Sequence, residues 1–137
     1  MLVVTLLASC SAEPEPIAYG KDSCHTCKMT LVDNRFGAEI VTKKGKVYKF
    51  DDMTCMINFY NSGQEKEEDM AFRLAVDFNI PGQLVNAQEA FYSKSPEIKS
   101  PMGGQVAAFS TKEQFQNRNE EWHGILLTWG ELLTQYK

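Results

Sequence analysis

The sequence predicts an α+β protein in which two small, repeated β-β-α-β units pack on one another. Three observations support this fold class. Residues 36–50 hold two strand-like runs around a lysine-rich turn, residues 53–60 have the apolar spacing of a helix, and the second half repeats this order. Pro81-Gly82, a dipeptide typical of turns, separates the halves. Each half is too small to bury an adequate core alone, so the halves are expected to contact each other.

The first unit is expected to span residues 21–80. Its predicted strands share apolar or β-branched residues with partial alternation: 36–41, 47–50 and 72–78. Asp51 is the expected N-cap of the helix between the second and third strands. The apolar residues of that helix recur at one-face spacing, at Met53, Met56, Ile57 and Tyr60. Gly63 is expected to end the helix.

The second unit is expected to span residues 81–137 and to repeat the same element order. Its predicted strands flank a loop rich in proline and glycine (95–104) and a helix: 90–93, 105–109 and 124–129. Ser110 and Glu113 have the spacing of a capping box, which predicts a helix that runs to about Asn119.

The N-terminal residues predict a lipid anchor. Residues 1–9 are a short apolar stretch that ends in small residues, typical of a signal peptide, and Cys10 follows where bacterial lipoproteins carry their lipidated cysteine. Residues 10–20 are rich in proline and glutamate and predict a flexible tether. The expected location is the bacterial cell envelope, attached to a membrane through Cys10 and facing the periplasm. Ser11 lacks the inner-membrane retention signal of some bacteria, which favours the outer membrane.

Composition argues against several classes of function. The formal net charge is −4, and the basic residues cluster only in the turn at 43–46, so nucleic acid is not an expected partner. The apolar run at the N-terminus is too short to cross a bilayer. The sequence contains neither a convincing Ser/His/Asp set nor a glycine-rich phosphate loop, so a binding protein is expected and not an enzyme.

Cys24 and Cys27 begin the strongest candidate site. Two residues separate them, a spacing that lets both sulfurs of a tight turn face one ion. Met29 follows Cys27 by two residues, so in an extended chain both side chains would project from the same face. Thiolate and thioether together favour Cu(I) over Zn²⁺. The pattern therefore predicts a Cu(I) site that includes Cys24, Cys27 and Met29.

The same cysteines allow other interpretations. The main alternative is a thiol-disulfide redox pair of Cys24 and Cys27, with His25 between them. A structural zinc site would need a second pair of ligands, and the sequence has no second motif of this spacing. Cys55 is interpreted as a half-buried structural residue, and Asp51 first of all as a helix cap. On composition alone, Met102 is a loop hydrophobe.

Several short runs, taken together, resemble one family. They are Cys24-x-x-Cys27-x-Met29, Phe36, residues 45–52, Cys55-Met56 and Pro101-Met102-Gly103. This combination resembles NosL, a family of bacterial lipoprotein copper chaperones that assist assembly of the copper-sulfide centre of nitrous oxide reductase. The resemblance covers roughly residues 20 to 130.

The resemblance implies more than the residues alone. It implies a fold of repeated β-β-α-β units related to organomercurial lyase, and Cu(I) binding near the Cys/Met motif. Cys27 and Met29 are the first ligand candidates that it implies, followed by Cys24 and Met102. It also implies apo nitrous oxide reductase as the protein that receives the copper. A copper donor in the cell envelope would be a further partner.

Overall fold

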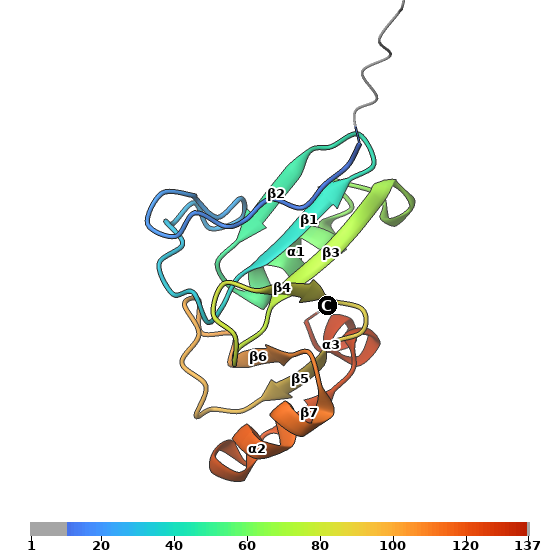
Figure 1. Cartoon of the computed structure of the whole chain (residues 1–137). Coiled ribbons are helices and arrows are strands. Elements are labelled where there is room, and N and C mark those ends of the chain that lie inside the picture. The colour runs from blue at the N-terminus through green and yellow to red at the C-terminus, as the bar shows by residue number, and fades with distance from the viewer. Residues whose placement is uncertain (1–10, 137) are drawn as a thin grey trace, which may run out of the picture.

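In the computed structural model, residues 11–136 are described, and they form two antiparallel sheets and three α-helices (Figure 1). The elements in chain order are β1 (Ala38–Thr42), β2 (Val47–Phe50), α1 (Met53–Ser62), the 3-10 turn η1 (Glu67–Asp69), β3 (Met70–Val76), β4 (Leu84–Asn86), β5 (Phe91–Lys94), β6 (Val106–Phe109), α2 (Lys112–Trp122), β7 (Ile125–Leu127) and α3 (Trp129–Gln135). This mixture of small sheets and helices confirms the predicted α+β class.

The first three strands of the two sheets share one topology. The first sheet has the strand order β2-β1-β3-β4 and the second has the order β6-β5-β7. Among the first three strands of each sheet, the one that comes first in the chain lies between the other two, and a helix precedes the third. A parallel bridge between Asp77 and Ala108 joins the sheets, with the Phe78 amide donating to the Ala108 carbonyl at 2.8 Å. β4, which follows Pro81-Gly82, belongs to the first sheet.

The helix caps differ from the prediction by one residue. Asp52, not Asp51, caps α1, because its carboxylate accepts the Thr54 amide. Thr111, not Ser110, caps α2. The Ser110 hydroxyl instead donates to the buried Asp77 carboxylate at 2.6 Å, and this bond links the second sheet to the end of the first.

The C-terminal region also differs from the prediction, in which residues 124–129 were a strand. β7 ends at Leu127, and Thr128 begins α3 with a complete capping box in which Glu131 reaches back to the Thr128 amide. Trp129 is therefore the first residue of a helix. β4 and η1 were not expected, and β3 begins at Met70, two residues earlier than predicted. Gly63 ends α1 as expected, in the left-handed conformation with φ 73°.

The first sheet is covered on both faces. α1 lies behind it in Figure 1, and its buried residues Met56 and Ile57 pack in the same core as Ile40 and Phe50 of the strands. The blue N-terminal segment crosses the front of β2 and β1 in the same view. A second, aromatic core that includes Phe109 lies beside the second sheet.

The N-terminal segment is held against the sheet by its residues 15–22, which we call the strap. The Glu15 amide donates to Glu39 at 2.8 Å, and Lys49 forms ion pairs with Glu15 at 3.3 Å and with Asp22 at 2.7 Å. Ile17 is buried in the core of the first sheet. The flexible tether predicted over residues 10–20 is therefore wrong for the strap, because these contacts fix it to β1 and β2.

Two predictions concern the N-terminus and the membrane. The signal peptide at 1–9 and the lipidated Cys10 lie outside the described residues, so both stay predictions. Within residues 11–136, no helix combines the length and the apolar character that crossing a bilayer requires.

Glu39 beneath the strap gives a testable pH dependence. Its side chain is fully buried, and one carboxylate oxygen has no hydrogen-bond partner. Burial raises the pKa of Glu39 to about 7, although the Glu15 amide and Lys49 oppose this shift. Because the folded pKa exceeds the unfolded one, Glu39 favours folding most below about pH 4.3, and this contribution is lost as the pH rises through 7.

We therefore expect Glu39→Gln to flatten the fall in unfolding free energy between about pH 4.3 and 7, a fall of roughly 4 kcal/mol at about 1.4 kcal/mol per pH unit. Above pH 7 the variant should be more stable than the parent protein. Urea unfolding followed by tryptophan fluorescence at several pH values measures this. Glu89→Gln, at an exposed carboxylate, is the matched control. Parallel pH profiles for the parent and Glu39→Gln would contradict the assignment.

Candidate metal centre

Cys24 and Cys27 lie on a tight loop between the strap and β1. The Cys24 amide donates to the Met29 carbonyl at 2.8 Å, and the Lys28 amide donates to the Cys24 carbonyl at 3.0 Å. Ser23 and Thr30 form an antiparallel bridge that closes the base of the loop. The loop therefore turns both cysteines toward the body of the protein.

The other half of the site is the start of α1. Asp51 directly follows β2, and Cys55 lies on the first turn of the helix. The Thr26 hydroxyl donates to the Cys55 carbonyl at 2.9 Å, and the His25 amide donates to the Lys49 carbonyl at 2.8 Å. These two bonds fasten the cysteine loop to the strand–helix corner.

Four potential ligands meet at this corner. One sulfur each from Cys24, Cys27 and Cys55, and one carboxylate oxygen of Asp51, all lie within 4.8 Å of one another. The Cys27 sulfur is 3.4 Å from Asp51 Oδ1, and the Cys55 sulfur is 3.4 Å from the same oxygen. Thiolates on one ion, with metal–sulfur bonds of about 2.3 Å, stand about 3.8 Å apart. Small side-chain adjustments would therefore bring all four donors onto one metal ion.

The protonation of the cluster suits metal binding. A hydrogen bond with Cys55 lowers the pKa of Cys24 to about 4, whereas the same bond raises the pKa of Cys55. Burial raises the pKa of Cys27 to about 11 and also raises the pKa of Asp51. Among the thiols of the metal-free cluster, Cys24 is therefore the most acidic, and Cys27 and Cys55 keep their protons more firmly. A metal ion must displace those protons, so its affinity is expected to rise with pH.

The structure brings together two of the four predicted ligands, Cys24 and Cys27. Met29 is 58% exposed and Met102 is 42% exposed. Lys28 adopts the left-handed conformation with φ 68°, so the chain from Cys27 to Met29 is not the extended segment that the prediction assumed. Both methionine residues are exposed, and their role as ligands stays a prediction.

The loop that carries Met102 is nevertheless anchored at this corner. The Met102 amide donates to Asp52 Oδ2 at 3.0 Å, and the Gly104 amide donates to the same oxygen at 3.4 Å. A Cβ at Gly104 would lie 2.5 Å from both Asp52 and Thr54, so only glycine permits this close approach. One aspartate thus joins the Met102 loop to the helix next to the cluster.

The predicted ligand set did not include Cys55 or Asp51. Cys55 is 4% exposed and its sulfur belongs to the cluster, and the structural role that the sequence favoured for it stays a prediction. Asp51 contacts two thiols and does not cap the helix. The usable signal was their separation of four residues, which across the start of a helix brings two side chains onto one side.

His25 has a different environment. Its ring packs edge-on against Tyr48 at 4.7 Å and against Phe59 at 5.2 Å between ring centroids. His25 is also outside the group of four close donors. In this structure it fastens the cysteine loop to an aromatic cluster.

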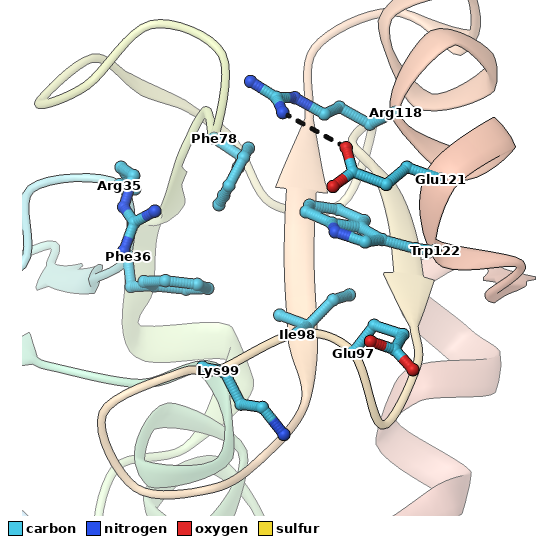
Figure 2. Close-up of a pocket in the computed structure, with 9 residues that line it drawn as sticks. All are labelled: Arg35, Phe36, Phe78, Glu97, Ile98, Lys99, Arg118, Glu121 and Trp122. Carbon is cyan, nitrogen blue, oxygen red and sulfur yellow. Dashed lines mark ion pairs between the residues drawn. The ribbon is translucent and has the colours of Figure 1, made fainter.

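A separate pocket of about 210 Å³ is lined by three aromatic residues from outside the strands, Phe36, Phe78 and Trp122 (Figure 2). Phe36 and Trp122 face each other across it, and the guanidinium groups of Arg35 and Arg118 lie 5.5 and 5.3 Å from the centre of the Phe78 ring. The lining contains aromatic, aliphatic and charged side chains but neither cysteine nor methionine. The pocket is therefore distinct from the thiol cluster.

Fold and site together define a small two-sheet α+β protein with a buried thiol–carboxylate cluster that can hold a metal ion. The family model of NosL matches residues 17–136, and the chain belongs to the NosL family. Its fold is similar to that in the crystal structure of the copper chaperone NosL from Shewanella denitrificans, with a TM-score of 0.73 and 21% sequence identity. That match covers 87% of this chain and 94% of the other. A comparison with curated proteins finds no match.

Proposed function

We propose that this protein is a Cu(I)-binding metallochaperone. The observation that carries the proposal is the convergence of three thiols and one carboxylate within 4.8 Å in a member of the NosL family. Thiolates are the ligands that Cu(I) prefers, and exposed thioethers beside them, at Met29 and Met102, would extend the same soft donor set. Membership of a chaperone family also fits a binding protein and not an enzyme.

The burial of the ligands supports transfer of the ion. Cys24 is 1% exposed, whereas Cys27 is partly exposed at the edge of the cluster. An incoming ligand from a partner would reach the ion beside Cys27 while Cys24 and Cys55 still hold it. Copper could then pass by stepwise ligand exchange, with no release into solvent.

The client and the location complete the proposal. We propose that the copper is delivered to apo nitrous oxide reductase for assembly of its copper-sulfide centre, and that an envelope copper donor loads the chaperone. The protein would face the periplasm, anchored through a lipid on Cys10, with the outer membrane favoured. These statements rest on the NosL family and on the sequence of residues 1–11.

The first test is metal content after anaerobic reconstitution of the reduced protein with Cu(I). We expect about one tightly bound Cu(I) per chain, and weaker binding in Cys27→Ser and in Met29→Ala, because soft sulfur donors hold this ion. Competition with a chromophoric Cu(I) chelator measures the affinity. Val32→Ala, at an exposed apolar residue of the same segment, is the control for Met29→Ala. Retention of no Cu(I), or unchanged affinity in both ligand variants, would refute the proposal.

A second candidate function is thiol-disulfide exchange with envelope proteins. It is favoured by one contact, in which the Cys27 amide donates to the Cys24 sulfur at 3.5 Å. Reductase activity that requires Cys24 and Cys27, but is unchanged in Met29→Ala, would support this candidate over the metallochaperone.

A further inference from the structure

The cluster has one chemical property that Cu(I) delivery does not use. It places three oxidisable thiols beside a carboxylate, and no disulfide links the described cysteines 24, 27 and 55. We propose that Cys24 and Cys27 reduce Cu(II) to Cu(I) at this site and become a disulfide, with Asp51 as the first ligand of the incoming Cu(II). This activity goes beyond the proposed function, because it needs neither the client nor delivery.

The Asp51 carboxylate gives the cluster a ligand for Cu(II). Cu(II) prefers oxygen and nitrogen donors, whereas Cu(I) prefers sulfur. A site with both carboxylate and thiol donors can therefore bind the incoming Cu(II) and then hold the Cu(I) that forms. Asp51 is the carboxylate of the cluster, and both of its oxygens lie near the Cys27 sulfur, at 3.4 and 3.5 Å. Cys27 is also partly exposed, while Cys24 and Cys55 are buried. Cu(II) would therefore meet Asp51 and Cys27 together at the accessible edge.

Geometry selects Cys24 as the partner of Cys27. Both lie on one short loop, so their sulfurs can approach without movement of a sheet or helix. The Cys27 amide already donates to the Cys24 sulfur at 3.5 Å, which places that sulfur directly beside Cys27. Cys55 lies on the first turn of α1, and the Thr26 hydroxyl donates to its carbonyl. Its sulfur also lies within 4.8 Å of the other two, so a disulfide to Cys55 is the competing outcome that the test must distinguish.

The electron balance needs two copper ions. Cys24, as the thiolate, and Cys27, as the thiol, together lose two electrons, the Cys27 proton passes to solvent, and one sulfur–sulfur bond forms. Each of two Cu(II) ions accepts one electron and becomes Cu(I). The product retains one thiol, Cys55, and the Asp51 carboxylate, so the number of thiolates available to copper falls from three to one. Oxidation would therefore also loosen the hold of the site on Cu(I).

The test mixes the fully reduced chain, without oxygen, with two equivalents of a Cu(II) salt. We expect the electron paramagnetic resonance signal of both Cu(II) ions to disappear, and the protein mass to fall by two hydrogen atoms. Trypsin releases residues 22–28 as one peptide that contains both Cys24 and Cys27, so the mass loss should lie within it. Asn58→Ala, at an exposed position of α1, is the matched control and should keep this reaction. Cys24→Ser and Cys27→Ser should lose the intramolecular disulfide and react at a rate that depends on protein concentration.

Two results would overturn the inference. They are a lasting Cu(II) signal and a disulfide that joins the 22–28 peptide to the peptide of Cys55. Cu(I) affinity is measured separately under reducing conditions. Normal Cu(I) binding without Cu(II) reduction would refute this inference alone, and reduction without Cu(I) binding would refute the metallochaperone instead.

Discussion

Replacing Cys55 by serine is expected to weaken Cu(I) binding roughly 100-fold or more, because loss of even an outer-sphere partner of a metal ligand costs 10–100-fold in affinity. The Cys55 sulfur is one of the four donors within 4.8 Å. Serine has a similar shape but is a poor ligand for Cu(I). Its hydroxyl can still donate to Asp51, which accepts from the Cys55 thiol in the parent protein, so the fold should persist.

Chelator competition measures this affinity, and urea unfolding of the metal-free protein measures stability. Asn58→Ala, on the same helix but at an exposed position, is the matched control. Its affinity for Cu(I) should change by no more than a few-fold. An affinity for Cu(I) in Cys55→Ser equal to that of the control would show that Cys55 is structural, as its sequence context suggested. A loss greater than about 100-fold, beyond what an outer-sphere partner costs, would place the Cys55 sulfur on the ion.

The fold could largely be predicted because its elements obey local rules. The turn at 43–46 and the apolar spacing after residue 52 identify β1, β2 and α1, and the second half carries the same signals. α3 was missed because it has only seven residues, and Ile125 to Trp129 look like one apolar strand. The Thr128–Glu131 capping box was the signal that a helix begins there.

Only part of the site was predicted, because only part of it lies within one short segment of the sequence. Cys24 and Cys27 are local to one loop, so their spacing is visible in the sequence. Cys55 and Asp51 join them only because the hydrogen bonds of His25 and Thr26 fold that loop onto the strand–helix corner. Contacts between residues some 30 positions apart in the sequence produce no periodic pattern from which they could be predicted. Asp51 and Asp52 are both acceptable caps in the sequence, and only the helix register decides between them.

Asp52 gives the prediction with the largest expected loss of stability. Asp52→Ala should lower the free energy of unfolding by roughly 3 kcal/mol, since a lost N-cap costs about 1 kcal/mol and each buried amide left without an acceptor costs about 1–3 kcal/mol. Asp52 is fully buried, and its carboxylate accepts the amides of Thr54, Met102 and Gly104. The Met102 loop should therefore separate from α1 as the helix start frays.

Asp51→Asn is the matched control, since the neighbouring carboxylate makes no cap and contacts thiols instead. Its unfolding free energy should change by less than about 1 kcal/mol, because the amide has the same shape and one oxygen still accepts. Its affinity for Cu(I) should fall, whereas metal-free Asp52→Ala should differ from the parent mainly in stability. Urea unfolding and chelator competition on both variants separate the two roles. Equal losses of stability in both would mean that the two carboxylates act as one capping unit, and that Asp51 is no part of the metal centre.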